Sequence, residues 1–472
     1  MKILFTHSYF LRFDEKQWNQ SKPYPPLATI QAASVLREKG HEVQLFDTNF
    51  VEDPMELNQA LAEFNPEVLV IYDDGFNYLT KMCLTRMREA AFEMIQLSKS
   101  KGLNVFVSSS DSTDHFESYL NKGADAVILG EADETLLQIV TNISKKDSFN
   151  QIGGIAFLEN DEIKQNQKRP VLTHLTSLPL PAWDLVDITP YKRAWSQHGY
   201  FSINIATTRG CPYKCNWCAK PIYGNRYNSR SPQHVVDEIK LIKSHFNFDH
   251  IWFCDDIFGL KPQWVQEFNQ ILKGENIQIS YKIQSRADLL LKDDTIISLA
   301  ESGCDEVWIG AESGSQKILD AMDKGTSIQQ ITDSTALMKK HGIKPCYFLQ
   351  FGYPGEEWED IQATLNMLFT QMPHDIGVSV SYPLPGTKFY EVVKSQLSEK
   401  ANWTDSDELL MMYKGTYSPE FYKKLHRYLH KRFRAKQALN NAKKGKVKEL
   451  LKWVYFTSSA QLYYYQVLAL KK

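Results

Sequence analysis

The chain has 472 residues, more than one ordinary hydrophobic core organises, so we expect two or three domains. Hydrophobic residues make up 43% and charged residues 23% of the chain, which is the balance of a soluble globular protein. No apolar stretch reaches the roughly 18 residues that a transmembrane helix needs, which argues against a membrane-spanning chain.

The first 145 residues alternate short apolar strands with helices. Helices are expected over residues 27–39 and 78–100, and Gly40 and Gly102 end them, because glycine accepts the left-handed conformation of a helix cap. The alternation predicts an α/β domain with a doubly wound, Rossmann-like parallel sheet, whose ligands bind beyond the carboxyl ends of the strands. The expected strands are residues 3–6, 43–46, 68–72, 105–107 and 126–129.

Residues 146–199 form a connector. A hairpin is expected around Asn160 and Asp161, and the alternating prolines of residues 178–185 exclude a helix and favour an extended segment. A second β/α series occupies residues 200–395 and predicts a partial (β/α)6 barrel. Its expected strands are residues 203–207, 251–254, 281–284, 307–309, 347–351 and 378–382.

Three of the seven cysteines lie within eight residues, directly after the first strand of this second series. The thiolates of Cys211, Cys215 and Cys218 can hold three irons of a [4Fe–4S] cluster and leave the fourth iron open to a substrate. A zinc site would need a fourth ligand, and His234 and Cys254 do not have zinc-like spacing. Disulfides are disfavoured by the odd number of cysteines, and free thiols with an oxygen-labile cluster predict a reducing, cytoplasmic location.

Polar or small residues follow the other strands of the series. Carboxylates and an arginine fork at these strand ends suit a charged ligand, and a glycine lets a ligand approach the backbone. The aspartates can equally cap a helix, and the arginine can be an exposed surface residue. The residues are Asp255, Asp256, Ser285, Arg286, Glu312 and Gly352.

Residues 396–472 are expected to be helical, basic and aromatic from about Tyr417 onward. From Lys414 to Lys472 there are 15 Lys and Arg residues against Glu420 and Glu449, a net charge of about +13, whereas the preceding residues carry about −15. This asymmetry indicates a separate partner surface. Either the aromatic side chains pack onto the barrel and the lysines remain solvated, or the helices contact an anionic membrane.

The run from Arg209 to Cys218, the strand-end residues and the Pro-Leu-Pro-Ala-Trp-Asp segment at 179–184 resemble cobalamin-binding-domain radical-SAM proteins. The resemblance is to the branch that contains anaerobic Mg-protoporphyrin monomethyl ester cyclases and hopanoid and phosphonate methylases. It covers nearly the whole chain, and it implies a cobalamin-type N-terminal domain before a radical-SAM partial barrel and a helical C-terminal region.

The resemblance also implies roles for individual residues. Cys211, Cys215 and Cys218 would ligate a [4Fe–4S] cluster whose open iron binds S-adenosyl-L-methionine. The implied contacts with S-adenosyl-L-methionine are Trp217 and Gly352 with the adenine, Asp255 and Asp256 with the ammonium group, Ser285 and Arg286 with the carboxylate, and Glu312 with the ribose. Trp217 can also shield the cluster from water.

Cobalamin binding has a weaker signature in this chain. The Asp-x-His-x-x-Gly motif of the best-known cobalamin modules is absent, and His7 and His115 lack its flanking residues, but the related branch generally lacks this ligand as well. A Rossmann-like domain that has lost its cofactor is the alternative. The implied cobalamin contacts are Ser108, Ser109 and Ser110 after the fourth strand and Gly130 and Glu131 after the fifth.

The resemblance predicts a radical-SAM enzyme that generates a 5′-deoxyadenosyl radical to methylate, cyclise or rearrange an unactivated carbon of a small or lipid-like substrate. Its catalytic residues are not identified from the sequence, and its electron donor would be a flavodoxin or ferredoxin. The alternatives are a radical-SAM enzyme without cobalamin and an RNA-modifying protein. A nucleic-acid partner is disfavoured because the sequence shows no upstream cysteine triplet and no terminal β-barrel.

Overall fold

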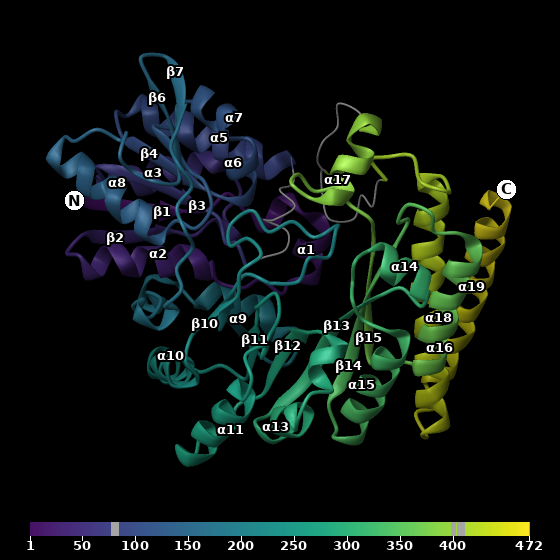
Figure 1. Cartoon of the computed structure of the whole chain (residues 1–472). Helices are drawn as coiled ribbons and strands as arrows, with labels where there is room; N and C mark the ends of the chain where they lie inside the picture. Colours follow the sequence, from purple (N-terminus) through teal and green to yellow (C-terminus); the bar gives the residue numbers. More distant parts are fainter. Residues whose placement is uncertain (77–84, 398–402, 404–410, 472) are drawn as a thin grey trace. The chain divides into compact units, whose positions relative to one another are not determined.

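The computed structural model describes residues 1–76, 85–397, 403 and 411–471. The chain divides into two compact units (Figure 1). Unit 1 contains Met1–Pro212, Lys220–Gln284 and Asn402–Glu408, and unit 2 contains Tyr213–Ala219, Ser285–Ala401 and Leu409–Lys472. The first residues of the expected helix over 78–100, with Cys83, lie outside the described residues.

Unit 1 contains a seven-stranded sheet with the order β2-β1-β3-β4-β5-β6-β7. The first five strands in this order are parallel, and β6 and β7 are antiparallel additions. Ile3 of β1 lies opposite Val43 on one side and Val68 on the other. The strands are β1 (Lys2–Thr6), β2 (Glu42–Phe46), β3 (Val68–Tyr72), β4 (Asn104–Ser108), β5 (Ala126–Ile128), β6 (Ile155–Glu159) and β7 (Glu162–Gln165).

Helices cover both faces of this sheet, because successive strand residues point to opposite sides. Ile3 and Phe5 belong to a core shared with α2 and α8, whereas Leu4 belongs to a core shared with α3, α5 and α7. The doubly wound N-terminal domain is therefore confirmed. Its helices are α1 (Glu15–Gln20), α2 (Leu27–Glu38), α3 (Leu57–Phe64), α5 (Thr85–Ser100), α6 (Ser110–Asp114), α7 (Phe116–Asn121) and α8 (Asp133–Lys145).

The connector contains the expected hairpin and one helix that the sequence did not predict. Asn160 and Asp161 turn between β6 and β7 with left-handed backbone conformations. Short 3-10 turns occur at Leu175–Ser177 and Trp183–Leu185, on either side of the proline run. The unexpected helix is α9 (Thr189–Ser196), which is anchored by the fully buried Trp195 and Tyr191.

The second parallel series is the predicted half-barrel, and its strands are divided between the units. In unit 1, Ile251 of β11 lies opposite Ile203 of β8 and Tyr281 of β12. In unit 2, β14 pairs in parallel with β13 and β15. The strands are β8 (Ser202–Ile205), β11 (His250–Phe253), β12 (Tyr281–Ser285), β13 (Cys304–Glu312), β14 (Lys344–Phe351) and β15 (Asp375–Val380).

Helices follow the strands of this series in turn, as the β/α pattern predicts. They are α10 (Pro232–His245), α11 (Trp264–Gly274), α12 (Ala287–Leu290), α13 (Thr295–Glu301), α14 (Gln316–Ala321), α15 (Ile328–Lys340) and α16 (Trp358–Gln371). A two-residue ladder that the sequence did not predict joins β9 (Thr208–Arg209) to β10 (Asn228–Ser229). This antiparallel pair brings together the two ends of the segment that contains the cysteines.

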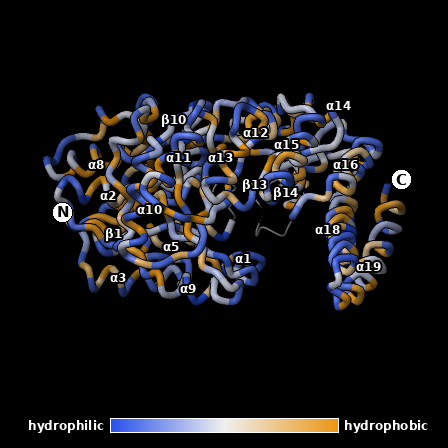
Figure 2. Tube along the Cα trace, turned by 90° about the horizontal axis from the view of Figure 1, so that it is seen from below, coloured by the Kyte–Doolittle hydropathy of each residue, from blue (hydrophilic) through white to orange (hydrophobic). Residues whose placement is uncertain are grey.

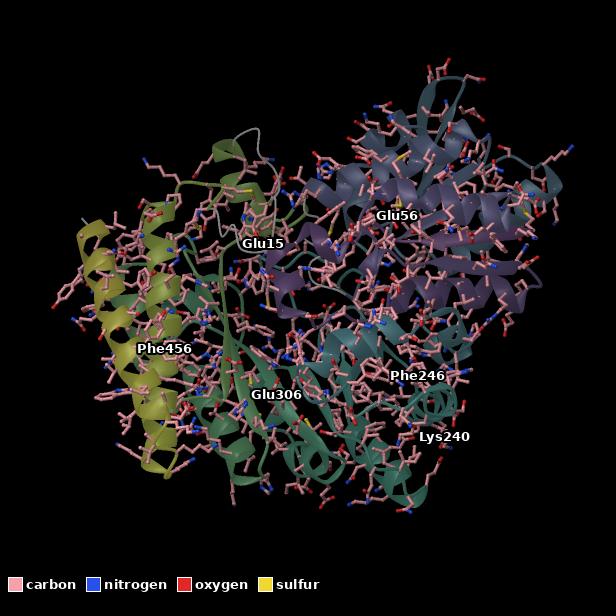
Figure 3. The ribbon with its side chains drawn as sticks, turned by 180° about the vertical axis from the view of Figure 1, so that it is seen from behind. Glu15, Glu56, Lys240, Phe246, Glu306 and Phe456 are labelled. Atoms are coloured by element: carbon pink, nitrogen blue, oxygen red, sulfur yellow. The ribbon has the colours of Figure 1, made fainter. Side chains whose placement is uncertain are left out.

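The C-terminal region is helical, as predicted. It contains α17 (Lys388–Val393), α18 (Pro419–Lys443) and α19 (Glu449–Leu470), and the last two lie side by side as an antiparallel pair (Figures 1 and 3). Ser418 caps α18 by accepting a hydrogen bond from the Phe421 N–H. Within the described residues, no helix combines the length and the apolar character that crossing a membrane requires.

Candidate cluster and cofactor site

The cysteine loop begins in unit 1 with Cys211 and continues in unit 2 with Cys215 and Cys218. Cys211 is buried, the other two are half-buried, and all three are free thiols. The Cys218 N–H donates to the Cys215 carbonyl at 3.2 Å, which makes a tight turn between these two thiols. The described residues include no preformed group of three His, Cys, Asp or Glu side chains placed to hold a metal, so cluster ligation stays a prediction.

The chain that enters the loop is held by buried charges. The guanidinium of Arg209, two residues before Cys211, donates to Glu131 and at 2.6 Å to Asp133, and the three side chains are almost completely buried. Burial alone would lower the pKa of Arg209, but Asp133, Tyr223 and Glu131 raise it well above its usual value. Arg209 therefore stays charged and ties the loop to the residues that follow β5.

Asp255 fixes the residues just before Arg209. Its carboxylate accepts from the Thr207 N–H and the Thr208 N–H, both at 2.7 Å, and from the Thr207 hydroxyl at 2.6 Å. Burial raises the pKa of Asp255 to about 6 although these bonds lower it. Asp256 is exposed, and the following helix α11 has Gln263 at its N-cap, so neither aspartate caps that helix.

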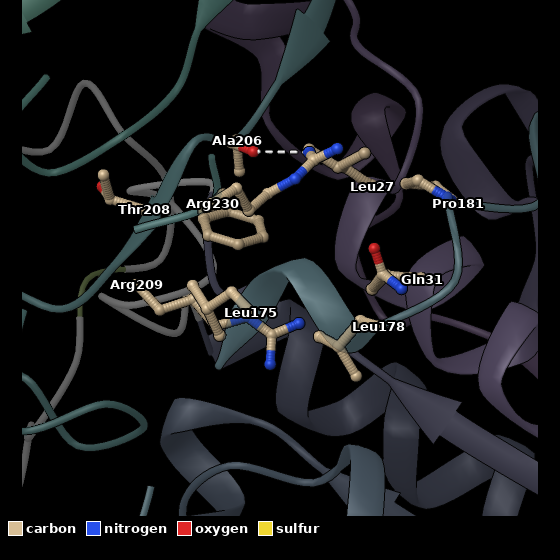
Figure 4. A pocket seen from close by; sticks show the side chains of 10 residues that line it. Leu27, Gln31, Leu175, Leu178, Pro181, Ala206, Thr208, Arg209 and Arg230 are labelled. Atoms are coloured by element: carbon tan, nitrogen blue, oxygen red, sulfur yellow. Dashed lines mark hydrogen bonds between the residues drawn. The ribbon is translucent and has the colours of Figure 1, made fainter. Parts of the chain in front are cut away.

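A cavity beside this segment is too small for a cofactor. Its volume is about 20 Å³, enough for about one water molecule. Arg230 donates to the Ala206 carbonyl at 2.9 Å on one wall of the cavity (Figure 4). Thr208 and Arg209 line the cavity together with the proline run of the connector. The cavity belongs to the packing of the loop entrance and offers no room for S-adenosyl-L-methionine.

The chain that leaves the loop is held by neutral hydrogen bonds within unit 2. The Asn216 side chain donates to the Ala321 carbonyl at 2.6 Å and accepts from the Tyr353 hydroxyl at 2.9 Å. Its backbone N–H donates to the Met322 carbonyl, and its carbonyl accepts from the Phe389 N–H, both at 3.0 Å. Asn216 thereby connects the loop to the ends of α14 and β14 and to the start of α17.

Arg286 is buried and engaged with its own unit. Four of its N–H groups donate to Asp288, to the carbonyls of Lys324 and Gly325, and to the Thr326 hydroxyl, at 2.8–3.1 Å. Its guanidinium lies 3.7 Å from the centre of the Tyr213 ring in the cysteine loop. In this structure Arg286 therefore holds the segment around Lys324, and Ser285 beside it is buried.

Glu312 forms a buried ion pair beside the cysteine loop. Lys324 donates to Glu312 at 2.7 Å, and burial lowers the pKa of Lys324 while Glu312 and Cys215 raise it, with a net upward shift. A Cβ at Gly310 would lie 2.5 Å from both charged groups, so a side chain there would displace this ion pair. Glu312 has a left-handed backbone (φ 55°), which is strained for a non-glycine residue.

Gly352 lies beneath side chains of the C-terminal region. Its φ is 80°, and a Cβ there would lie 2.9 Å from the Met411 side chain. The Gly352 carbonyl accepts from the Tyr413 hydroxyl, and its N–H donates to Glu356 at 2.6 Å. Burial raises the pKa of Glu356 to about 8, so this carboxyl is mostly protonated at neutral pH. Because Gly352 has no side chain, a neighbour can approach its backbone closely, and in this structure that neighbour is the Met411 side chain.

Trp217 offers a test of whether the residues of the loop fit a cofactor. Its indole Nε1 is buried and donates to no acceptor within the described residues. Buried donors are almost always satisfied, so this group fits a site whose remaining partner is a bound group. Within unit 2, the thiols of Cys215 and Cys218, the indole of Trp217 and the cationic Lys324 have the chemistry that an anionic iron–sulfur cluster with a ligand beside it requires.

The residues implied for cobalamin lie at the carboxyl edge of the first sheet. Ser109 caps α6 in a reciprocal pair with Ser112, and Ser108 accepts from the Asp73 N–H at 2.9 Å. Ser110 is buried, and its hydroxyl has no partner in the described part of the chain. Gly130 has a φ of 96°, and a Cβ there would lie 3.4 Å from the Ile222 carbonyl.

Glu131 binds Arg209 and the Leu172 N–H, so both of its carboxylate oxygens have protein partners. The two histidines, His7 and His115, both have protein partners. His7 binds Asp47 at 2.9 Å and Thr48, and His115 lies 3.8 Å from Asp111. Within this edge, the unpartnered Ser110 hydroxyl is the feature that fits a bound polar group.

Several residues of the site carry no signal that sequence analysis could use. Arg209 and Asp133 meet from 76 positions apart, and Lys324 meets Glu312 from a segment with no motif. Asn216 was visible between the second and third cysteines but its partners were not. The one hint in the sequence was Gly310, a residue without a side chain two positions before the strand-end carboxylate Glu312.

Comparisons with known proteins agree with the sequence over both domains. Residues 205–368 match the model of the Radical SAM superfamily. An uncharacterized methyltransferase of Pyrococcus horikoshii is 26% identical over 80% of this chain and 81% of its own length. The anaerobic magnesium-protoporphyrin IX monomethyl ester cyclase of Synechocystis is 22% identical, over 84% of this chain and 78% of its own. The hopanoid C-3 methylase of Methylococcus capsulatus is 23% identical, over 79% and 70%.

Two solved structures share the fold of the chain. OxsB, a cobalamin-dependent S-adenosylmethionine radical enzyme solved with aqua-cobalamin, matches with a TM-score of 0.76 over 99% of this chain and 72% of its own, at 17% identity. TsrM from Kitasatospora setae, a radical S-adenosylmethionine methyltransferase with cobalamin and a [4Fe–4S] cluster, matches with a TM-score of 0.68 over 84% and 75%, at 19% identity. The predicted resemblance is confirmed, and residues 205–368 form a radical-SAM domain.

Proposed function

We propose that this protein is a cobalamin-dependent radical-SAM enzyme that methylates or cyclises an unactivated carbon. The observation that carries the proposal is the cysteine loop, placed directly after the first strand of a radical-SAM domain that follows a doubly wound sheet. The relatives named as a methylase and a cyclase, and the similarity to cobalamin-dependent structures along the whole chain, support it. The proposed domains are residues 1–145, 146–199, 200–395 and 396–472.

Cys211, Cys215 and Cys218 are the proposed ligands of the [4Fe–4S] cluster. When bound, the cluster and S-adenosyl-L-methionine supply a 5′-deoxyadenosyl radical, and cobalamin supplies a methyl carrier. Trp217 would offer its indole N–H to the ligand beside the cluster, and the buried Lys324 would place a positive charge near an anionic cluster. The protein's remaining task is to position both cofactors and to keep water out.

The proposed contacts with S-adenosyl-L-methionine divide into two groups. Asp256, Ser285 and Trp217 are proposed to touch it directly. Asp255, Arg286, Glu312 and Gly352 already bind protein groups, so we propose that they act chiefly by holding the segments at 207–208, 324–326 and 353–356 that border the site. For cobalamin, Ser108, Ser109, Ser110, Gly130 and Glu131 are the proposed residues, with Ser110 the one whose hydroxyl needs a partner.

The decisive experiment is anaerobic reconstitution with iron, sulfide and cobalamin, followed by removal of unbound material. The proposal expects corrin absorption bands together with cluster absorption, and 5′-deoxyadenosine after addition of reductant. Cluster absorption and 5′-deoxyadenosine without retained corrin would favour the alternative, a radical-SAM enzyme without cobalamin. Absence of both would overturn the assignment. Comparing metabolites of cells with and without the gene then identifies the substrate class.

The proposed substrate is a small or lipid-like molecule, by analogy with relatives named for a protoporphyrin ester and a hopanoid. A flavodoxin or ferredoxin is the proposed electron donor, and the reducing cytoplasm is the proposed location. A lipid-like substrate would be met at a membrane surface, and we propose that the C-terminal helices make this peripheral contact.

A further inference from the structure

Exposed apolar side chains are concentrated along α19 and in the turn that precedes it. Of the 14 large hydrophobic residues that are exposed in the described part of the chain, seven lie between positions 447 and 465. Exposed apolar side chains gathered on one segment are typical of an interaction site. The seven residues are Val447, Leu450, Leu451, Val454, Tyr455, Leu462 and Tyr465.

Helix α19 is apolar on two faces, and only one of them is covered. Ala460 and Val467 are buried, the Tyr464 ring lies 5.1 Å from that of Tyr428 on α18, and Lys431 of α18 lies 5.3 Å from the Phe456 ring (Figure 3). Leu451, Leu462 and Tyr465 recur at helical spacing on the other side and are exposed. Tyr455 is also exposed, but Lys431 of α18 lies 4.9 Å from its ring centre, so it borders the covered face. Hydrophobic positions recur along α19 (Figure 2). The apolar face of α19 that α18 leaves uncovered needs a second partner.

The turn between the two helices is strongly basic. We define the hairpin tip as residues 443–455, which include the end of α18, the turn and the first two turns of α19. The tip carries five lysines against Glu449 alone, and four of its exposed apolar side chains lie between or beside those lysines. The lysines are Lys443, Lys444, Lys446, Lys448 and Lys452, and all five are exposed.

The charge and composition of the tip select one class of partner. A second copy would bring two surfaces of the same charge together, and lysine is depleted from the cores of protein interfaces. A nucleic acid would satisfy the lysines but would leave Val447, Leu451 and Val454 facing a polar backbone. An anionic bilayer satisfies both, because apolar side chains enter the headgroup region while lysines bind anionic headgroups. Trp453 and the tyrosines of α19 suit the same interface.

We propose that the hairpin tip docks on the surface of an anionic lipid bilayer, with Val447, Leu450, Leu451 and Val454 in the headgroup region and the five lysines on lipid phosphates. The inference rests on the proposed membrane contact and not on the proposed reaction. Each lysine near an anionic surface strengthens binding about fivefold. The tip thereby places the protein where an amphiphilic substrate is concentrated.

The test uses the full-length protein and vesicles of phosphatidylcholine with or without 30% phosphatidylglycerol, about the anionic fraction at which polybasic segments bind. Co-sedimentation should show at least tenfold tighter binding to the anionic vesicles. The apolar variant Val447→Ser/Leu451→Ser/Val454→Ser should bind at least tenfold more weakly. The charge variant Lys443→Gln/Lys444→Gln/Lys446→Gln/Lys448→Gln should lose at least tenfold and should also lose most of the salt dependence. Matched controls elsewhere, Val392→Ser and Lys388→Gln, should stay within twofold of the wild type.

Equal binding to both vesicle types, or unchanged binding of the two tip variants, would overturn the proposal. A concentration-dependent dimer in light scattering that the apolar variant dissolves would assign the surface to a second copy instead. Thermal unfolding identifies any variant that has lost its fold, and the single substitution Leu451→Ser then replaces the triple. Iron content and 5′-deoxyadenosine formation should not change in the tip variants, so failure of lipid binding and failure of the proposed reaction are separate results.

Discussion

The segments on either side of the cysteine loop differ in the contacts that hold them. The entering chain is fixed by side-chain charges, with Arg209 between Glu131 and Asp133 and with the Asp255 carboxylate on Thr207 and Thr208. The leaving chain is fixed by the uncharged Asn216, through its amide and its backbone. The buried cations of unit 2, Lys324 and Arg286, bind Glu312 and Asp288.

The two kinds of contact imply different tolerances to substitution on the two sides of the cysteine loop. A buried ion pair that loses one partner leaves an uncompensated charge, so the entering chain is intolerant of change. Neutral hydrogen bonds at a half-buried position cost far less to lose, so the leaving chain can adjust while Cys215 and Cys218 take up iron. The comparison predicts a steep order of effects for substitutions on the two sides.

The largest effect is expected for Arg209→Ala. Removing the guanidinium leaves Glu131 and Asp133 buried without their cation, which should cost about 3–5 kcal/mol of stability in unit 1. Chemical unfolding measures the loss, and iron content after reconstitution shows whether the loop still assembles.

The triple variant Arg209→Ala/Glu131→Gln/Asp133→Asn is the matched control. It removes the same guanidinium but leaves no buried charge, so it should recover most of the lost stability. Equal instability of the single and triple variants would show that shape, and not charge, holds the entering chain.

Glu356, which binds the Gly352 N–H in unit 2, tests whether a buried carboxyl group there is uncharged in the folded protein. Its pKa rises from 4.5 to about 8 in the folded protein, so its stabilising effect is complete below pH 4.5 and is lost as the pH rises through about 8. Glu356→Gln keeps the neutral form, and the variant should gain about 2–4 kcal/mol over the wild type between pH 5 and pH 9. Parallel unfolding curves across this range would contradict a buried, protonated Glu356.

A smaller effect is expected for Asn216→Ala. The variant loses two neutral hydrogen bonds, to Ala321 and from Tyr353, and should lose about 1–2 kcal/mol. Asn216→Asp keeps the acceptor for Tyr353 and removes the donor, so it should fall between the wild type and the alanine variant. A cost for Asn216→Ala as large as that for Arg209→Ala would break the comparison.

The sequence predicted elements that depend on local pattern. The alternation of strands and helices, the end of α2 before Gly40 and the helical C-terminal region are local features, and all are present. Cys254, Cys304 and Cys346 are buried, as their apolar surroundings predict. The β9–β10 ladder was missed because two residues per strand leave no periodicity, and α9 was missed because it is short and contains a proline.

Partners across long sequence distances could not be predicted. Asp255 was expected to contact a ligand. Its hydrogen bond with the Thr207 N–H could not be predicted, because the two residues are 48 positions apart in the sequence. Arg286 was expected to bind the carboxylate of a ligand, and its protein partners include the Asp288 carboxylate and the carbonyls of residues 324 and 325. Residue type and strand position identified groups near the site, whereas their partners depend on tertiary packing.

The central claim is that Cys211, Cys215 and Cys218 hold a [4Fe–4S] cluster. The most direct measurement is iron and sulfide content with Mössbauer spectra after anaerobic reconstitution of the wild type, the three single alanine variants and the triple variant. Cys304→Ala is the matched control, because this thiol is buried and lies outside the loop. We expect about four irons per chain in the wild type and in Cys304→Ala, and a [4Fe–4S] signal lost in every loop variant. Wild-type iron content in the triple variant would contradict the claim.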